Sequence, residues 1–347
     1  MSSFAVMAAT DSTPEKDPVD VSKIISDHMD DAYEWHILSW AKGEKSLTLS
    51  LPIIVYSKQS GWSAFSSSHL RDGATYKGFK IAPAGATSEG KVVEQRNGEW
   101  KRPTLDISMT KIVLAMLVNS LIVIIIIMCA ARWYKNRKET DEAPGGFVGF
   151  MEMLIMMLYD DLIKTSIKDN PKRFAPYLLT VFFFILINNL MSLIPIFPGG
   201  VGVTGNIAVT AFLAICTFLA VNLFGTKEYW KGILWPDVPL MLKVPIPILP
   251  AIELLGIFTK PFALMIRLFA NMMAGHMSLL ILFCLIFLTS SMGPGINGTM
   301  TVTSILFTLF MNLLELLVAF IQAYVFTLLS AVYIGLAQEG AKKKVKN

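Results

Sequence analysis

An arginine and a histidine stand nine residues apart in a long stretch that is otherwise almost wholly apolar. Arg267 and His276 lie between residues 250 and 288, which read as membrane-embedded. A charged side chain at the centre of a bilayer costs about 2.5–3.5 kcal/mol on insertion scales, so it usually faces a carboxylate, a water path or an ion. We therefore expect Arg267 to be functional. The alternatives are a side chain that reaches the lipid headgroups or one that closes a structural ion pair.

The residues around Arg267 form one narrow face of the expected helix. Successive residues turn by about 100° around a helix, which places small and polar side chains within about 40° of Arg267. Small residues let the backbone of another helix approach closely. This face is therefore predicted to contact other helices rather than lipid, either those of a partner or those of this chain. Its members are Glu253, Gly256, Lys260, Ala263, Asn271, Ala274 and Ser278.

A second set of polar residues lies in the last two apolar segments, with one residue in the first of them and three in the other. His276 lies roughly opposite Arg267 on its helix, while Glu315 and Gln322 share a face of the final helix, with Asn312 nearby. A buried carboxylate, an imidazole and an amide can pass protons or hold a water chain. Together they favour a polar half-channel, although a histidine in a structural hydrogen bond would also fit.

The composition is that of a polytopic membrane protein. Of 347 residues, 54% are hydrophobic and 16% are charged, whereas a soluble protein has about 25% charged residues. Cys129, Cys216 and Cys284 lie in apolar runs and their spacing indicates neither a disulfide framework nor a metal site. No Walker A, His-Glu-x-x-His or Gly-x-Ser-x-Gly motif occurs, which argues against nucleotide binding and intramembrane proteolysis. We expect no cofactor and no nucleic-acid partner.

The apolar runs predict an all-α membrane domain with about five crossings. The last two runs would reach about 58 Å and 51 Å as helices, against a hydrocarbon core of about 30 Å. They must therefore tilt strongly, bend or run partly along the membrane, and a Gly- and Ser-rich loop at 290–301 joins them. An amphipathic helix at 147–168 is expected to lie on the cytoplasmic surface. The expected spans are 110–131, 174–197, 206–224, 250–288 and 304–337.

The charges flanking the spans predict the orientation of the chain. Arg132, Lys135, Arg137 and Lys138 follow the first span directly, and four lysines lie between residues 342 and 346. Because basic residues mark the cytoplasmic side, the C-terminus is expected inside and residues 10–106 outside.

Residues 10–106 contain no spanning run and predict a small mixed α/β domain. Periodicity favours a helix from Asp20 to Ala41, followed by strands near 46–51, 53–56, 75–81 and 91–95. The expected helix carries His28, Asp31, Glu34 and His36, but their spacing matches no zinc site, and a solvated acidic helix is favoured. Residues 1–9 fit either the remnant of a signal peptide or a disordered tail.

The run Arg267-Leu-Phe-Ala-Asn-Met-Met-Ala-Gly-His276 resembles the signature of subunit a of F-type ATP synthases, the membrane stator against which the c-ring turns. The resemblance covers roughly residues 107–340. It includes Glu253, the run Glu315-Leu-Leu-Val-Ala-Phe-Ile-Gln322 and the run Asn189-Leu-Met-Ser-Leu-Ile-Pro195. It implies a membrane domain at 107–347, and the large N-terminal region looks like that of a bacterial subgroup.

The resemblance also implies roles for individual residues. Arg267 would face the c-ring carboxylate with Asn271 one turn beyond it, and Gln322 would help to hold the arginine region. His276 and Glu315 would line the half-channel that opens outside, and Glu253 would lie near the cytoplasmic exit. The outer half-channel would also involve Asn188, Asn189, Ser192 and Asn206. Ser192 stands where many members have Asp, so the outer mouth is expected to be less acidic.

The function implied is that of a non-catalytic, proton-conducting subunit in the bacterial inner membrane. Its partners would be the c-ring of subunit c, the peripheral stalk of subunit b and the remainder of the F1Fo complex. An ion-coupled secondary transporter is the alternative, but such proteins usually contain inverted repeats, and none is evident in this sequence.

Overall fold

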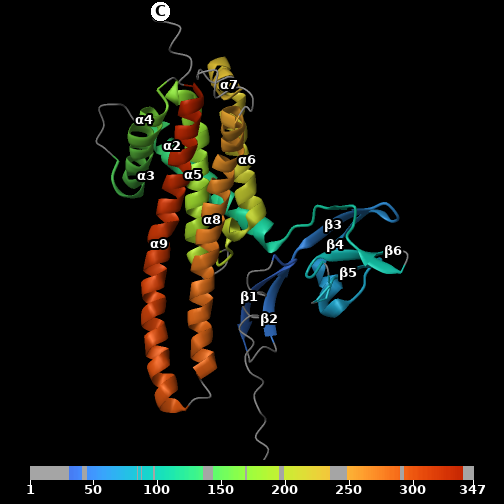
Figure 1. The fold of residues 1–347 in the computed structure, drawn as a ribbon. Helices are drawn as coiled ribbons and strands as arrows, with labels where there is room; N and C mark the ends of the chain where they lie inside the picture. Colours follow the sequence, from blue (N-terminus) through green and yellow to red (C-terminus); the bar gives the residue numbers. More distant parts are fainter. Residues whose placement is uncertain are drawn as a thin grey trace, which may run out of the picture.

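The chain forms a bundle of long helices with a β-rich domain attached at one end (Figure 1). The computed structural model describes residues 31–40, 45–83, 85–86, 88–96, 98–135, 144–168, 170–194, 199–234, 248–289 and 293–338. The expected signal-peptide remnant or tail at residues 1–9, His28 and the C-terminal lysines lie outside these ranges.

The described part of the N-terminal domain contains short antiparallel strands in three small sheets. Alternate residues of β3, including Ile53 and Val55, are fully buried and pack with Tyr33, Phe79 and Val92. The sheets are β1–β2, β4–β3–β8 and β5–β6–β7. The strands are β1 (Glu34–Trp40), β2 (Lys45–Ser50), β3 (Pro52–Ser57), β4 (Gly61–Ser66), β5 (Phe79–Ile81), β6 (Val92–Arg96), β7 (Glu99–Lys101) and β8 (Leu105–Asp106), with a 3₁₀ turn, η1, at Ser67–Gly73.

The helix expected from Asp20 to Ala41 is wrong where the structure describes it, because Glu34–Trp40 is strand β1. Tyr33 and Trp35 are buried on either side of a half-buried Glu34, which is the alternation of a strand. β2 completes the pairing, and its alternating pattern was predicted correctly. Glu34 is not simply solvated, because its carboxylate pairs with Arg71 at 2.6 Å.

Long helices make up most of the described membrane domain, in agreement with the expected all-α polytopic fold. α2, α5, α8 and α9 are each long and apolar enough to cross a membrane. α6 qualifies together with α7, from which it is separated by a 104° bend. The described part of the chain thus contains four helices that could cross a membrane, or five spans if the bent pair is one. The helices are α2 (Lys111–Lys135), α5 (Pro171–Leu193), α6 (Ile207–Leu223), α7 (Lys227–Leu234), α8 (Ile248–Leu288) and α9 (Pro294–Gln338).

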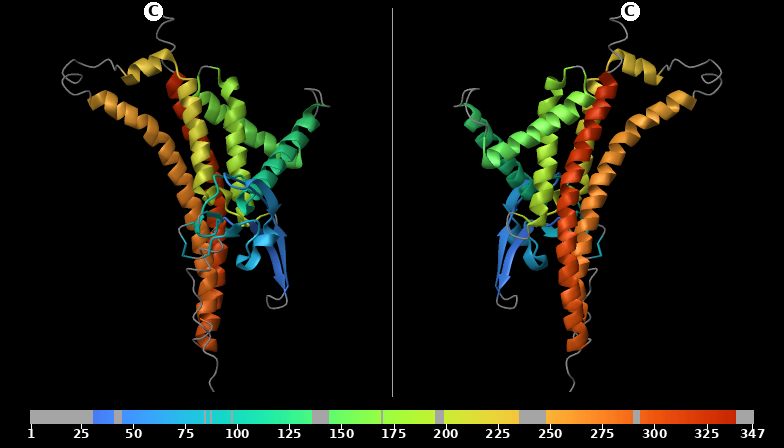
Figure 2. Two further views of the ribbon diagram at one scale, coloured as in Figure 1. Left: turned by 90° about the vertical axis from the view of Figure 1, so that its right-hand side faces the viewer. Right: turned by 90° about the vertical axis from the view of Figure 1, so that its left-hand side faces the viewer.

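The α8–α9 hairpin extends beyond the ends of α5 and α6 on the side of the N-terminal domain (Figures 1 and 2). The helices contain 41 and 45 residues, about 62 Å and 68 Å at about 1.5 Å per residue. α8 curves away from α9 towards its first residues (Figure 2) and continues through Pro261. The loop expected at 290–301 is wrong in its second half, since α9 begins at Pro294. Proline suits a first helical position, where its missing N–H is not needed.

The expected amphipathic helix comprises α3 (Gly146–Met156), a π-helical stretch η2 (Met157–Ile163) and α4 (Lys164–Ser166). Its stripe divides into two parts: Phe147 and Phe150 are exposed, whereas Leu158 and Leu162 are buried against the bundle. The end of α4 lies so close to α9 that an ideal Cβ on Gly335 would stand 2.1 Å from the carbonyl oxygen of Ser166.

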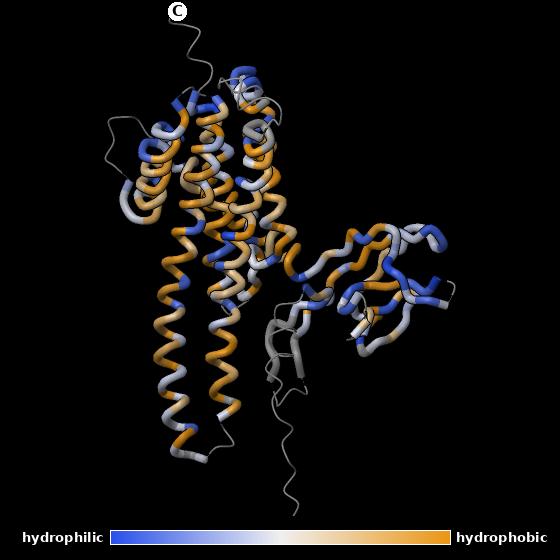
Figure 3. Tube along the Cα trace, viewed as in Figure 1, coloured by the Kyte–Doolittle hydropathy of each residue, from blue (hydrophilic) through white to orange (hydrophobic). Residues whose placement is uncertain are grey.

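One apolar core joins α5, α6, α8 and α9. Leu178 and Phe182 of α5, Leu264 and Leu268 of α8, and Phe326 of α9 belong to it and are at most 3% exposed. Many large apolar side chains on the helices are exposed, among them Phe258, Phe262 and Leu309. Hydrophobic residues dominate along the helices, while hydrophilic residues gather at the helix ends near the C-terminus and in the β-rich domain (Figure 3). An exposed apolar surface around a helical bundle is typical of a domain that lies in lipid.

Candidate functional site

The Arg267 face of α8 is open. Arg267, Asn271 and Ala274 are exposed, while Leu268 and Met272 on the other side of α8 are buried. The chain's own helices therefore leave the face open around Arg267, whereas Lys260 at its other end lies over the ring of Tyr333 of α9, 5.6 Å from its centroid. Arg267 forms no ion pair with any side chain in the described parts of the chain. Its guanidinium is thus available to a group outside this chain.

Glu315 of α9 is buried directly beside α8. It is 6% exposed, and neither carboxylate oxygen has a hydrogen-bond partner among the described residues. An ideal Cβ on Gly275 would lie 2.8 Å from Oε1 and 3.0 Å from Cδ. The absence of a side chain at Gly275 therefore makes the space that the carboxyl group occupies. A buried polar atom without a partner is costly. The Glu315 carboxyl group is therefore stabilised if it binds a proton, a water molecule or a positive charge.

His276, the residue after Gly275, faces the segment between α5 and α6. An ideal Cβ on Gly202 would lie 2.9 Å from the imidazole Nε2 and 3.0 Å from Cδ2. The imidazole thus lies against the backbone of this segment. Gly202 and Gly275 are site residues that our sequence reasoning missed. For Gly275 the local signal was a glycine directly before a histidine in an apolar segment, whereas Gly202, between two valines, gave no such signal.

A cavity of about 410 Å³ adjoins this pair. Its polar lining comes from Ser192 of α5, Gly200, His276 of α8 and Asn312 of α9. Glu315 does not line it, but lies about one helical turn from Asn312 and next to Leu316, which does. The structure therefore brings Ser192, His276 and Asn312 together around a space large enough for several waters.

The other three outer residues are engaged in hydrogen bonds within the bundle. Asn188 accepts from the Asn119 side chain at 3.0 Å, which joins α5 to α2. Asn189 accepts from the Thr204 hydroxyl at 2.6 Å and donates to the carbonyl of Ala319 at 3.4 Å. Asn206 caps α6 by accepting from the backbone N–H of Ala208 at 2.8 Å. None of these three lines the cavity.

Gln322 and Glu253 lie further along the two long helices. α8 and α9 run antiparallel with Gly275 opposite Glu315, so Gln322 lies near the level of Arg267 and is half-buried. Glu253 is exposed, fourteen residues before Arg267, which is about 21 Å along a helix. Among the described residues, no three His, Cys, Asp or Glu side chains gather where a metal ion could bind.

Comparisons with known proteins match the helical part and the N-terminal part of the chain to two different families. Residues 114–335 match the family described as ATP synthase A chain, and residues 24–109 match a domain of unknown function (DUF8433). ATP synthase subunit a of Chloroherpeton thalassium is 41% identical over 237 residues, 67% of this chain and 67% of that protein. ATP synthase subunit a 2 of Chlorobaculum tepidum is 42% identical over 237 residues, 67% and 64% of the two chains. ATP synthase subunit a of Myxococcus xanthus is 38% identical over 240 residues, 67% and 74%.

Proposed function

Since this chain belongs to the ATP synthase A chain family, we propose that it is the proton-translocating stator subunit of an F1Fo ATP synthase. The observation that carries the proposal is Arg267, a charged residue exposed on an apolar helix without an ion pair among the described residues. Such a charge needs a partner outside the chain. We infer that the partner is the carboxylate of subunit c, presented by a ring that packs on the Arg267 face.

The proton route has two separate parts. Protons enter from the outside through the cavity lined by Ser192 and His276, pass Glu315, and neutralise a carboxylate of the ring. The neutral acid then turns into the lipid, because an ionised acid would be far costlier there. After most of a turn it reaches the exit near Glu253 and releases its proton to the cytoplasm.

Arg267 separates the two parts of this route. Its positive charge attracts the ionised acid, and it stands between the inlet at His276 and the exit at Glu253. Arginine suits this position because it keeps its proton, whereas a desolvated lysine can lose it. Asn271 and Gln322 lie within about a turn of its level and support it. The chain itself catalyses no bond formation, since ATP is made elsewhere in the complex.

The setting of the subunit is the bacterial inner membrane. The basic residues Arg132 and Lys135 at the end of α2 support a cytoplasmic position for that end. Residues 10–106 then form a domain outside, and the C-terminus of the membrane domain at 107–347 lies inside. The peripheral stalk of subunit b is a further partner. No finding favours the secondary transporter.

The decisive test compares Arg267→Ala and Arg267→Lys in purified complex in lipid vesicles, with Arg132→Ala as control. We expect both Arg267 variants to abolish ATP-driven proton pumping, and Arg267→Ala to leak protons passively. Arg132→Ala should pump normally. Normal pumping without a leak by Arg267→Ala would refute the proposed function.

A further inference from the structure

The N-terminal domain contacts the segment that lies on His276. Trp35 of β1 is 6% exposed and belongs to one apolar cluster with Val201 and Val203, which lie between α5 and α6. Ile112 and Ala115 at the start of α2 complete this cluster. We call residues 199–206 the inlet loop. Its valines thus share an apolar cluster with a side chain of the N-terminal domain and with two of α2.

The opposite side of the inlet loop touches the proposed proton path. Gly202 lies between the two valines, and its ideal Cβ would stand 2.9 Å from Nε2 of His276. Gly200 lines the same cavity as His276. The apolar cluster that contains Trp35, Ile112, Ala115 and the two valines is therefore linked through Gly202 to the imidazole.

Both ends of the inlet loop are tied to α5. The backbone N–H of Gly200 donates to the carbonyl of Met191 at 3.1 Å, and Thr204 donates to Asn189 at 2.6 Å. The centre of the loop has His276 on one side and, on the other, the apolar cluster to which Trp35, Ile112 and Ala115 belong. Trp35 is the contribution of the N-terminal domain to that cluster.

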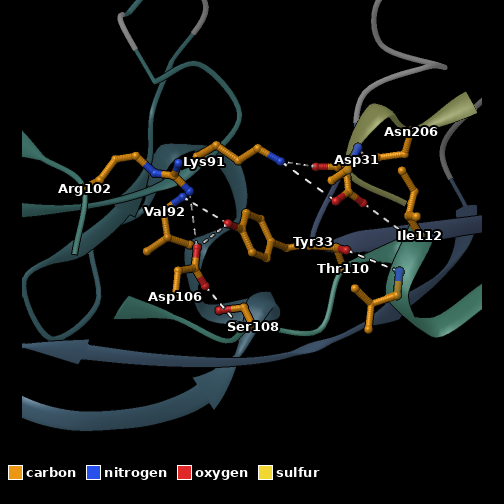
Figure 4. A network of polar contacts seen from close by, with 12 residues as sticks. Asp31, Tyr33, Lys91, Val92, Arg102, Asp106, Ser108, Thr110, Ile112 and Asn206 are labelled. Carbon is orange, nitrogen blue, oxygen red and sulfur yellow. Dashed lines mark hydrogen bonds and ion pairs between the residues drawn. The ribbon is translucent and has the colours of Figure 1, made fainter. Parts of the chain in front are cut away.

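The N-terminal domain is itself attached firmly to α2 (Figure 4). The Asp31 carboxylate accepts from the backbone N–H of Ile112 at 3.3 Å, and the backbone N–H of Lys111 donates to the carbonyl of Ala32 at 2.9 Å. Lys91 lies 4.0 Å from the other Asp31 oxygen. The bonds to Lys111 and Ile112 satisfy two N–H groups in the first turn of α2. They fix Asp31 and Ala32, which precede Trp35 by four and three residues, to the start of this helix.

We propose that the N-terminal domain positions the proton inlet: Trp35 presses the inlet loop onto His276, so that Gly202 holds the imidazole at the wall of the cavity. The inference rests on the proposed function, in which His276 belongs to the inlet. Trp35 and Gly202 are positioning residues, since neither donates nor accepts the transferred proton. Among the described residues, the ionisable Glu315 of α9 lies against Gly275, the residue before His276, and the inlet loop contains no ionisable residue.

The test measures ATP synthesis driven by a proton gradient in vesicles that carry the intact complex, with rates normalised to assembled complex. Trp35→Ala and Gly202→Ala are compared with two matched controls. Trp100→Ala removes an exposed tryptophan of the same domain, and Gly205→Ala adds a Cβ in the same loop where nothing lies within 4 Å.

We expect both test variants to slow synthesis about three- to tenfold when outer protons are scarce, because a misplaced group loses rate steeply with distance. The midpoint of the outer-pH profile should move to lower pH, while the rate at saturating outer protons changes less. Trp35→Phe should restore most of the profile, and both controls should match wild type. A purely structural role would lower the rate equally at every outer pH and would overturn the inference.

His276→Ala separates this inference from the proposed function. If His276→Ala leaves transport unchanged, the inlet assignment itself fails. If it slows transport while Trp35→Ala and Gly202→Ala behave as the controls do, only the positioning role is overturned. Because residues that act through one another are not additive, Trp35→Ala with His276→Ala should be no slower than His276→Ala alone, and a multiplied loss would contradict the inference. If Trp35→Ala prevents assembly, Trp35→Leu, which keeps an apolar side chain of smaller size, provides the test of the N-terminal domain, while Gly202→Ala tests the contact with His276.

Discussion

A methyl group added at Gly275 should disable the inlet by displacing the Glu315 carboxyl group. The Cβ of Gly275→Ala would stand 2.8 Å from Oε1, 3.0 Å from Cδ and 3.4 Å from Cγ of Glu315. The whole end of the Glu315 side chain must therefore move, and it has little freedom to do so because it is 6% exposed. Alanine is a better helix former than glycine by about 1 kcal/mol, so α8 itself should not be weakened.

The expected loss of transport rate follows from the distance between the added Cβ and Oε1 of Glu315. Ordinary van der Waals contact begins at 3.4 Å, so Oε1 must retreat by about 0.6 Å from its present 2.8 Å, and a misplacement of about 1 Å can cost about 100-fold in rate. We therefore expect proton transport by Gly275→Ala to fall about tenfold, which corresponds to about 1.4 kcal/mol in the barrier.

The assay is ATP-driven proton pumping by purified complex in vesicles, normalised to assembled complex. Gly298→Ala in α9 is the matched control, because its added Cβ would meet nothing within 4 Å. Glu315→Asp is one methylene shorter, so the double variant Gly275→Ala with Glu315→Asp should pump faster than Gly275→Ala alone. Equal pumping by Gly275→Ala and Gly298→Ala would show that the carboxyl group is not held where transport needs it.

Two further predictions concern stability. Gly335→Ala would place a Cβ 2.1 Å from the carbonyl oxygen of Ser166. The resulting backbone shift should cost about 1–3 kcal/mol, which would lower the melting temperature of the complex. Gly232→Ala in α7, whose Cβ meets nothing within 4 Å, should melt no lower than wild type, since alanine favours a helix over glycine. Burial, and then the neighbouring charge of Asp106, raises the pKa of the Tyr33 phenol above its ordinary value of 10.0. As the pH rises, the phenol of the unfolded chain therefore loses its proton before the phenol of the folded chain does. The contribution of the protonated Tyr33 to the free energy of unfolding is complete below pH 10.0 and declines as the pH rises further. In Tyr33→Phe this alkaline decline should be weaker, as followed by near-ultraviolet circular dichroism, and an identical decline would contradict this assignment.

The apolar segments and the special status of Arg267 could be predicted from the sequence because both are local properties. A bilayer requires long apolar runs, and the face around Arg267 follows from helical periodicity within one segment. The same local reasoning failed at Glu34–Trp40, where a roughly helical spacing of apolar residues concealed a strand. The strand forms because β2 lies beside it and Tyr33 and Trp35 have a core to enter, and neither fact is contained in the segment itself.

The contacts that build the inlet were decided by the tertiary structure. His276 and Glu315 could be named as polar residues in apolar helices, but the glycines that seat them could not. Gly275 faces Glu315 because α8 and α9 pack antiparallel in one particular register, and Gly202 meets His276 because α5 and α6 bring their connecting segment over α8. Trp35 reaches the same place only through the attachment of the N-terminal domain to α2. Sequence periodicity determines which face of a helix is polar, whereas the close packing of distant segments determines which groups touch.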